Sequence, residues 1–284
     1  MIKLRARAKI NLALDVIRKR KDGYHDVKMI MQQIDLYDDI EISEIPKKMI
    51  YINSNVHYVH NNRNDIAYKA AELLINKYPI DSGVEIKITK NIPVAAGLAG
   101  GSTDAAAVLM GMNQMFDLKI EKAELMDMSL SLGADIPFCI MGGCAIAEGI
   151  GEKLTPIKGL DAFVVLWKPN IRISTRNVYK KIKVNEIKEH PNIDEIAGYI
   201  KNRDFSNIKK STQNILESVT LEENEVVRII KNKLLELRAE VALMSGSGPT
   251  VFGLYRDYVT AEFAYEKLKK LYGETYLVKT FTVD

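Results

Sequence analysis

One stretch of the chain, residues 91–107, constrains the fold more than any other, because it is built almost entirely of small residues. It reads N-I-P-V-A-A-G-L-A-G-G-S-T-D-A-A-A, with three glycines and six alanines. A loop of this kind lets another molecule approach the backbone closely. The uncharged run Ala105 to Met112 predicts a buried helix, and Asp104 is expected to be an acid of its first turn. A glycine-rich loop that leads into a helix offers free backbone N–H groups, so the stretch predicts an anion site, and phosphate is the usual anion.

This interpretation has a structural alternative. The stretch fits neither of the two commonest phosphate loops, G-x-x-x-x-G-K-[ST] and G-x-G-x-x-G. Its glycines would then serve only close packing in a tight turn before a core helix. The remainder of the chain has to decide between the two.

Length and composition describe an ordinary globular protein. The chain has 284 residues, enough for two domains, with 47% hydrophobic and 27% charged residues. Its net charge of +3 indicates no polyanionic partner. The basic run Arg18 to Lys21 is short, adjoins an Asp-Gly turn and lacks interleaved aromatic residues. It therefore predicts a solvated loop rather than a nucleic-acid site.

Cysteine content and hydropathy indicate the cellular compartment in which the chain is expected. Cys139 and Cys144 are not spaced as a disulfide framework or a metal site, which favours a reduced, cytoplasmic protein. The N-terminus lacks the apolar segment of a signal peptide, and no stretch reaches the length of a membrane span. We therefore expect no membrane association.

The first strand is predicted from alternation. Residues 2–16 place apolar side chains at even positions and mostly polar ones at odd positions, which indicates a long half-buried strand. Lys9 and Asn11 lie on the polar face, where the pattern alone predicts solvated side chains. The turn D-G-Y-H follows at residues 22–25. Its tyrosine and histidine are either surface residues or a grip for a flat ring, through stacking and hydrogen bonding.

Periodicity and turn residues predict the other elements. The second half alternates strands and helices, as an α/β sandwich does. Residues 185–210 are polar and are expected to be irregular or lightly helical. The predicted strands cover residues 39–43, 84–88, 162–167, 241–255 (with an internal loop) and 275–283, and the predicted helices cover residues 64–77, 121–132, 222–238 and 259–271.

Asp135 stands in the apolar segment L-G-A-D-I-P-F-C-I-M-G-G at residues 132–143. A carboxylate in such surroundings needs a partner. Because Ile136 precedes a proline, the chain is expected to be extended there. The common use of such an Asp is to cap a helix or a turn. The functional alternative is a general base, or a charge opposed to a lysine.

Three small-residue stretches occur in a distinctive order. They are A-K-I-N-L at residues 8–12, P-V-A-A-G-L-A-G-G-S-T-D-A-A at residues 93–106 and S-G-S-G-P-T at residues 245–250. Together they resemble the galactokinase, homoserine kinase, mevalonate kinase and phosphomevalonate kinase (GHMP) superfamily. D-G-Y-H, M-Q-Q-I-D-L-Y-D and G-A-D-I-P-F are similar to the members that act on a cytidine-diphosphate-linked methylerythritol. The resemblance spans nearly the whole chain and thins between residues 180 and 240.

The resemblance implies an α+β fold of two domains, with the active site in the cleft between them. The ATP-binding domain would cover residues 1–155 and the C-terminal domain residues 156–284. The implied activity is ATP-dependent phosphorylation of the 2-hydroxyl of the cytidine-diphosphate methylerythritol, in the non-mevalonate pathway of isoprenoid synthesis. ATP and Mg²⁺ are the implied cofactors. The expected partner is that small molecule alone, without nucleic acid, and the expected state is a monomer or homodimer.

The resemblance also assigns site residues position by position. Lys9 and Asp135 match the catalytic pair, and Ser102 is the candidate protein ligand of the ATP-bound Mg²⁺. The residues that match the nucleotide site are Asn64, Lys90, Pro93, Gly97, Leu98, Ala99, Gly100, Gly101, Ser102 and Thr103. The residues that match the substrate site are Asn11, Tyr24, His25, Thr175 and Tyr179.

The chain departs from the family pattern at Arg7, where many members carry proline, and at Ala99, where many carry glycine. Two other functions stay open: a GHMP kinase for homoserine or mevalonate, and a catalytically silent nucleotide-binding regulator. The D-G-Y-H turn argues against the first, because a free small acid or alcohol needs no base-stacking site. The presence of both Lys9 and Asp135 argues against the second.

Overall fold

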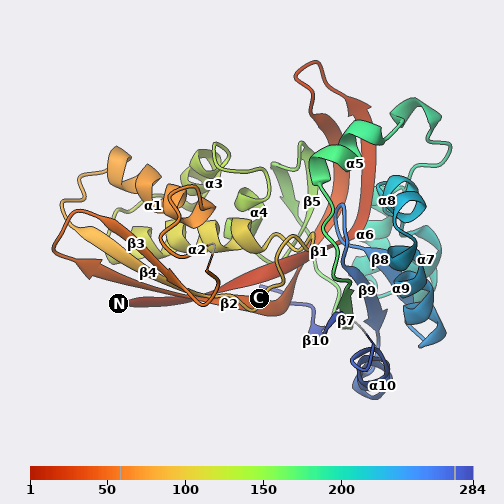
Figure 1. Ribbon diagram of the computed structural model, residues 1–284. Helices are drawn as coiled ribbons and strands as arrows, with labels where there is room; N and C mark the ends of the chain where they lie inside the picture. Colours follow the sequence, from red (N-terminus) through yellow and green to blue (C-terminus); the bar gives the residue numbers. More distant parts are fainter. Residues whose placement is uncertain (58, 272, 284) are drawn as a thin grey trace. The chain divides into compact units, whose positions relative to one another are not determined.

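The computed structural model describes residues 1–284 except residues 58, 272 and 284 (Figure 1). The chain forms two compact units, each built from segments that are far apart in the sequence. Unit 1 consists of Met1–Ala8, Leu36–Ile92 and Ala99–Gly142. Unit 2 consists of Lys9–Asp35, Pro93–Leu98 and Gly143–Asp284. Because neither unit is one continuous stretch, a single domain boundary near residue 155 stays a prediction.

Two long strands begin the chain, β1 (Ile2–Lys19) and β2 (His25–Ile45), and they pair with each other. The strand predicted at residues 2–16 is confirmed, and its predicted polar face is exposed at Lys3 and Arg5 but not further along the strand. From residue 8 to residue 16 both faces are buried, because later segments of unit 2, such as residues 213–215, pack beside β1. The lysine and asparagine of the A-K-I-N-L motif are therefore interior polar groups, which need partners inside the protein.

In unit 1, β2 pairs antiparallel with β4 (Gly83–Thr89), so that Ile42 lies opposite Ile86. Strand β3 (Ile50–Ser54) runs parallel to β4. Apolar residues of β4 are buried and alternate with exposed charged ones, as a sheet with one covered face requires. The strand predicted at residues 84–88 is thus confirmed.

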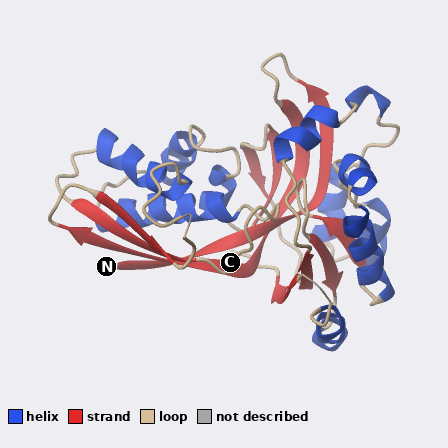
Figure 2. Cartoon of the chain, in the orientation of Figure 1, coloured by secondary structure: helices blue, strands red, loops and turns tan. Residues whose placement is uncertain are grey.

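Helices lie along one side of these strands (Figures 1 and 2). They are α1 (Ile66–Lys77), α2 (Gly100–Met115), α3 (Lys122–Ser129) and α4 (Ile136–Met141). The helices predicted at residues 64–77 and 121–132 correspond to α1 and α3. Helix α2 packs against both α1 and α4.

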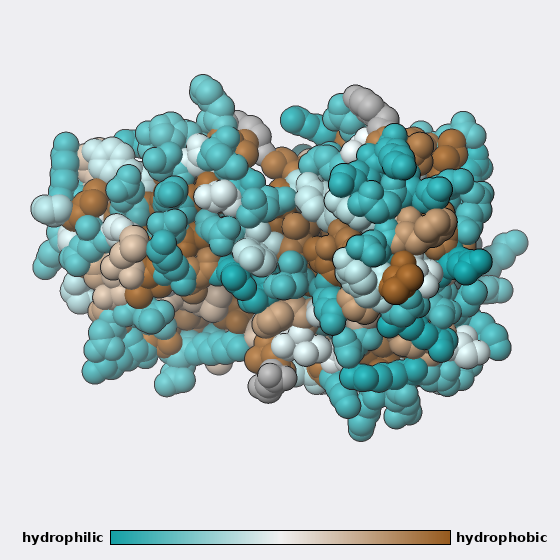
Figure 3. Space-filling view, turned by 90° about the horizontal axis from the view of Figure 1, so that it is seen from below, coloured by the Kyte–Doolittle hydropathy of each residue, from teal (hydrophilic) through white to brown (hydrophobic). Residues whose placement is uncertain are grey.

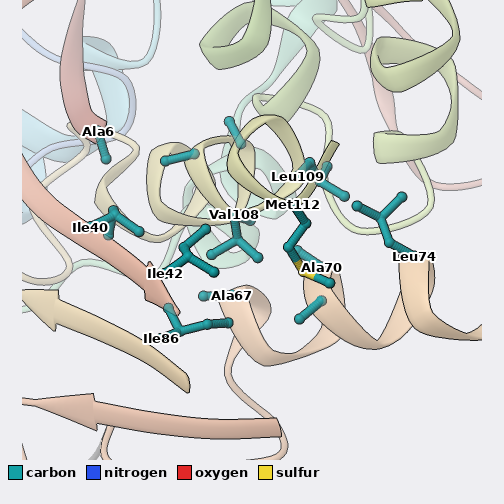
Figure 4. Close-up of a cluster of buried hydrophobic side chains, with 14 of the residues drawn as sticks. Ala6, Ile40, Ile42, Ala67, Ala70, Leu74, Ile86, Val108, Leu109 and Met112 are labelled. Carbon is teal, nitrogen blue, oxygen red and sulfur yellow. The ribbon is translucent and has the colours of Figure 1, made fainter. Parts of the chain in front are cut away.

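The core of unit 1 fills the space between these helices and the sheet (Figure 4). One face of α2 meets side chains from β2, β4 and α1. The labelled side chains of this core are Ala6, Ile40, Ile42, Ala67, Ala70, Leu74, Ile86, Val108, Leu109 and Met112. Each large apolar side chain buried in this way stabilises the fold by about 1.5–3 kcal/mol. This packing fixes the start of α2, where the glycine-rich loop ends.

Unit 2 contains an antiparallel sheet in the order β10-β7-β9-β8. Its strands are β7 (Phe163–Lys168), β8 (Val241–Met244), β9 (Val251–Tyr255) and β10 (Glu274–Lys279). Helix α9 (Glu225–Glu236) packs on β8 and β9, and α10 (Tyr258–Leu268) packs on β7, β9 and β10. The predicted strand, loop and strand of residues 241–255 are confirmed, and the loop is S-G-S-G-P-T.

The other elements of unit 2 include two short strands that the sequence analysis missed, β5 (Cys144–Gly149) and β6 (Lys153–Pro156). Strand β5 pairs antiparallel with β2 and with β6. The polar region that was expected to be irregular or lightly helical contains short helices. The remaining helical elements are α5 (Thr175–Lys181), the 3-10 helix Val184–Glu186, α6 (Ile193–Lys201), α7 (Phe205–Ser211) and α8 (Glu217–Glu223).

The surface is mixed in character. On the face seen in Figure 3, hydrophilic side chains alternate with apolar patches, as is normal for folded proteins. Within the described part of the chain, no helix has both the length and the apolar character needed to span a membrane.

Candidate active site

The first half of the glycine-rich loop belongs to unit 2 and packs against the loop at residues 245–250. Gly97 has a φ of +75°, and a Cβ atom there would overlap the Ser245 carbonyl oxygen and lie 3.1 Å from that of Gly248. The Ser245 hydroxyl donates a hydrogen bond to the Gly97 carbonyl at 2.9 Å. The two small-residue stretches of the sequence therefore meet, and glycine is required where they do.

A Gly97→Ala variant is expected to lose about 10²-fold in kcat/KM. The new methyl group would overlap the Ser245 carbonyl oxygen, so the glycine-rich loop would have to move away from Ser245. A displacement of about 1 Å is enough to misplace reacting groups and cause a loss of that size. A suitable control is Gly198→Ala in α6, where a Cβ atom would meet open space. Steady-state kinetics of both variants, with circular dichroism to confirm folding, would check this. Equal activity of the two variants would show that the close contact between Gly97 and Ser245 is not needed for activity.

The second half of the loop belongs to unit 1 and leads into α2, which begins at Gly100. Ala99 occupies the N-cap position with a φ of 60° and a ψ of 26°, and no side chain caps the helix. The first turn contains no acid. The prediction that Asp104 is a first-turn acid is wrong, because the helix starts at the paired glycines and places Asp104 in its second turn. An uncapped helix N-terminus with a glycine-rich approach favours an anion.

Two hydroxyl groups of α2 have different surroundings. Thr103 is buried, and its hydroxyl donates to the Arg7 carbonyl at 2.7 Å, so it holds the helix start to β1. Ser102 is only half-buried. A Cβ atom on Gly101 would lie 3.4 Å from Ile66, which places the beginning of α1 beside this turn.

Lys90, Asp38 and Asp104 form a buried ion cluster in unit 1, referred to below as the ion cluster. The Lys90 ammonium contacts the Asp38 carboxylate and lies 2.6 Å from Asp104 Oδ2. Asp38 Oδ1 also accepts hydrogen bonds from the backbone N–H groups of Asn91 and Ile92. The ion cluster therefore connects the segment before the glycine-rich loop to the helix after it.

Burial dominates the electrostatics of this cluster. It raises the pKa of Asp104 well above its usual range, although the Lys90 ammonium acts in the opposite direction. For Lys90, burial alone would lower the pKa, but Asp104 and Asp38 outweigh it and raise that pKa. Lys90 is thus a charged group enclosed by the protein, and a Cβ atom on Gly100 would lie 3.5 Å from its Nζ. Asn64, also matched to the nucleotide site, is exposed just before α1.

Lys9 and Asn11 are buried next to each other in unit 2. Lys9 Nζ donates to Asn11 Oδ1 at 2.7 Å, and Asn11 Nδ2 donates to Met29 Sδ at 3.2 Å. The Lys9 backbone N–H donates to the carbonyl of Leu98 in the glycine-rich loop. A Cβ atom on Gly246 would lie 3.7 Å from Lys9 Nζ and 3.6 Å from Asn11 Oδ1. A buried amine therefore lies against the loop at residues 245–250.

Asp135 belongs to unit 1 and occupies the N-cap position of α4, yet its side chain makes no capping hydrogen bond. The interpretation of Asp135 as a side-chain cap is therefore not supported. The prediction of an extended chain at Ile136 is wrong, because α4 begins there with Pro137 in its first turn. Proline is tolerated at that position because first-turn N–H groups have no helical acceptor.

The D-G-Y-H turn joins β1 to β2 in unit 2. Tyr24 is 61% exposed and His25 is buried. The Tyr179 ring, from α5, lies 5.3 Å from the His25 ring at an angle of 36°. Burial, together with the charge of Lys19, lowers the pKa of His25, so its ring is neutral near pH 7. An exposed aromatic ring and a neutral imidazole are thus adjacent in the sequence and belong to the same unit.

Helix α5 contacts both the D-G-Y-H turn and the loop at residues 245–250. Its first residue, Thr175, has its hydroxyl 2.7 Å from the Ser247 hydroxyl. The neighbouring basic run is partly neutralised, since Arg18 and Arg20 both pair with Asp26. All five residues matched to the substrate site belong to unit 2. The rings of His25 and Tyr179 are in contact, and Asn11 and Thr175 both lie against the loop at residues 245–250.

Sequence reasoning missed the residues that hold the two loops in place. Asp38 ends the M-Q-Q-I-D-L-Y-D motif, so its position carried a signal that was not used. Asn214, Glu217 and Thr220 contact residues 244–247 and lie in the region where no motif was recognised. A single sequence contains no local signal for such contacts, because they join segments that only the fold brings together.

Known proteins match this chain along its length. The GHMP kinases N terminal domain matches residues 65–143, and the GHMP kinases C terminal domain matches residues 196–274. The chain belongs to the GHMP kinase family, a family of ATP-dependent kinases of small molecules. The two-domain α+β fold expected from the resemblance is confirmed.

Two relatives and one solved structure carry the name of the same enzyme. The 4-diphosphocytidyl-2-C-methyl-D-erythritol kinase of Alkaliphilus metalliredigens (strain QYMF) is 49% identical over 282 residues, which cover 99% of this chain and 97% of the relative. The protein of that name from Clostridium botulinum (strain Kyoto / Type A2) is 50% identical over 277 residues, covering 97% and 99%. A crystal structure of 4-(cytidine 5'-diphospho)-2C-methyl-D-erythritol kinase matches with a TM-score of 0.87 at 28% identity, covering 99% of this chain and 100% of that one. Homoserine kinase from Cytophaga hutchinsonii shares the fold, with a TM-score of 0.77 at 17% identity, covering 99% and 94%.

Proposed function

We propose that this chain transfers a phosphoryl group from ATP to the 2-hydroxyl of 4-diphosphocytidyl-2-C-methyl-D-erythritol, giving the 2-phosphate and ADP in the non-mevalonate pathway of isoprenoid precursors. The observation that carries the proposal is the identity of 49–50% to relatives of that name over nearly their whole length. The buried Lys9–Asn11 pair beside the two small-residue loops supports it.

The residues of the loop fit the phosphates of a nucleotide. Helix α2 starts without a side-chain cap or a first-turn acid, and glycines precede it. We assign the backbone N–H groups of residues 97–102 to the phosphates, because the Thr103 N–H already donates to the Ala99 carbonyl at 2.9 Å. The half-buried Ser102 hydroxyl is assigned to the Mg²⁺ that accompanies them. ATP supplies the phosphoryl group, and Mg²⁺ neutralises charge on its phosphates. Among the residues described, no group of three or more His, Cys, Asp or Glu is arranged to hold a metal.

Phosphoryl transfer depends mainly on positioning and on stabilising charge. We assign Asp135 as the base that accepts the proton of the substrate hydroxyl and Lys9 as its electrostatic partner. The support is that Asp135 and Lys9 match the catalytic pair of the family, and that Lys9 is an enclosed amine oriented by Asn11. Such a preorganised positive charge stabilises negative charge as it develops, with little reorganisation.

The cytosine ring is assigned to the D-G-Y-H turn and α5. Tyr24 has the exposed ring that stacking requires, and Tyr179 provides a second aromatic surface beside His25. The neutral His25 ring can both donate and accept a hydrogen bond with the edge of a base. Thr175 lies on the same helix as Tyr179 and is assigned to the substrate with it.

A Tyr24→Ala variant is expected to raise the KM for the cytidine substrate and leave the KM for ATP unchanged. Stacking of a base on an aromatic ring is worth about 1–3 kcal/mol, which corresponds to about 5- to 150-fold in affinity. Because Tyr24 is largely exposed, the variant should fold normally. Tyr258→Ala, at another exposed tyrosine of unit 2, is the control. Equal changes of both KM values would contradict the assignment.

The proposed reaction is tested by an assay that couples ADP release to a signal, with ATP and Mg²⁺ present. The cytidine-diphosphate methylerythritol, homoserine and mevalonate are offered side by side. Turnover of the first alone is expected. Turnover of another acceptor would be consistent with the proposed mechanism but would contradict the substrate assignment. ATP binding without any turnover would favour the alternative of a catalytically silent nucleotide-binding regulator.

A further inference from the structure

Three polar side chains near α8 are buried although nothing in the proposed chemistry uses them. They are Asn214, Glu217 and Thr220, referred to below as the clamp. Asn214 forms a β-bridge with Leu14 just before α8, and its Oδ1 accepts the Leu216 N–H at 3.0 Å. Glu217 is the first residue of α8, and Thr220 lies three residues further on the same face of the helix. Buried polar groups need hydrogen-bond partners, and the partners here identify what the clamp holds.

The clamp holds the backbone of the loop at residues 244–247. Asn214 Nδ2 donates to two carbonyls, those of Met244 and Gly246, at 2.8 Å each. Glu217 Oε1 accepts the Met244 N–H at 2.8 Å. The Thr220 hydroxyl donates to the Ser247 carbonyl at 3.3 Å. Three side chains thus bond to consecutive parts of one loop, which fixes both its position and its orientation.

The same segment also holds strand β1. The Leu14 N–H donates to the Gln213 carbonyl, and the Leu14 carbonyl accepts from the Ile215 N–H, each at 2.9 Å. Strand β1 carries Lys9 and Asn11, to which the loop presents Gly246. One short segment therefore sets the distance between the strand with the buried amine and the loop that faces it.

An ion pair holds the Glu217 side chain of the clamp in place. Glu217 Oε2 pairs with Lys231 of α9, so the carboxylate is fixed on both sides. A buried carboxylate with a single partner would be costly, whereas one with an ammonium and a backbone N–H is satisfied. The clamp is therefore rigid, as expected of groups that position others.

We infer that Asn214, Glu217 and Thr220 are positioning residues, which hold the loop at residues 244–247 against Lys9 and Asn11 in the arrangement that phosphoryl transfer requires. This inference rests on the proposed function, because it takes Lys9 as part of the catalytic site. It predicts that weakening the clamp lowers kcat more than it alters either KM. A purely structural role predicts lower thermal stability with unchanged kcat.

The test uses a matched pair at one position. Thr220→Val keeps the shape but removes the donor to Ser247, and it is expected to lower kcat about 3- to 10-fold with both KM values within about 2-fold. Thr220→Ser retains the hydroxyl and should restore kcat. Asn214→Asp, which turns a carboxylate toward two carbonyls, should lower kcat by about 10²-fold if it folds.

A structural control and a second readout separate the possible outcomes. Asp204→Ala removes the N-cap of α7 elsewhere in unit 2, so it should lower the Tm without changing kcat. Hydrogen exchange of the peptide covering residues 244–250 should rise in Thr220→Val and not in Thr220→Ser. An unchanged kcat in folded Thr220→Val and Asn214→Asp, or an equal loss in Asp204→Ala, would overturn this inference alone. Absence of turnover by the wild-type chain on every acceptor would overturn the proposed function and this inference with it.

Discussion

An Asp135→Ala variant is expected to lose at least about 10²–10⁴-fold in turnover while it still binds ATP, because a positioned base typically contributes that factor. The residue lies at the N-cap position of α4 and makes no capping hydrogen bond, so alanine removes no side-chain cap from the helix. The loss should appear in kcat, since no ATP contact is assigned to Asp135. The measurement is steady-state kinetics, together with calorimetric titration of a non-hydrolysable ATP analogue.

Two further variants make this result specific. Asp135→Asn retains size and shape but cannot accept the proton, so its turnover should be as low as that of the alanine variant. Asp127→Ala removes an exposed carboxylate from α3 in the same unit and should leave turnover unchanged. Unchanged turnover in folded Asp135→Ala would show that another group, or no group, accepts the proton.

A Lys90→Met variant is expected to lower the free energy of unfolding by about 3–5 kcal/mol, because it leaves the buried carboxylates of Asp38 and Asp104 without their cation. The loss should depend on pH. Without Lys90 the pKa of Asp104, already raised by burial, would rise further, so the folded state would hold a proton that the unfolded state releases. Stability should then fall as pH rises above the usual range of Asp.

Urea unfolding at pH 5.5 and at pH 8 measures this effect, and the deficit should be larger at pH 8. Lys87→Met is the matched control, because its ammonium is exposed and pairs with Glu41 at the surface, where an ion pair is worth about 0–1 kcal/mol. ATP affinity should also fall in Lys90→Met and not in Lys87→Met, because the ion cluster holds the start of the glycine-rich loop through Asp38. Equal stability of the two variants would mean that the ion cluster does not hold unit 1 together.

The parts of the fold that could be predicted are those with local causes. The alternation in β4 and the small apolar residues of α2 are visible within a few neighbours, and both elements are present. The burial of the odd-numbered face of β1 could not be predicted, because residues 213–215 pack beside it from a distant part of the chain. At Ile136 a local rule failed, since proline restricts the preceding residue in general but is accepted in a first helical turn.

In the candidate site, too, residues in a continuous motif could be predicted and residues brought together by the fold could not. Gly97 and Ser102 could be named because the loop that contains them is a continuous motif. The partners of Lys90 could not, because Asp38 and Asp104 come from separate segments that only the folded unit brings to one ammonium. Motif reasoning therefore identified groups on the loops, and the structure identified the groups that hold those loops in place.

The discontinuous make-up of unit 2 has a consequence for synthesis of the chain. Residues 9–35 leave the ribosome long before residues 213–215 and 280–281, which pack beside them in this unit. At about 5–20 residues per second the delay is roughly 10–50 s, far longer than a strand needs to form contacts. For that interval β1 has β2 as its pairing partner but lacks the later segments that bury both of its faces over residues 8–16. Nascent chains of this protein should therefore depend on cellular factors that shield β1 until the last strands arrive.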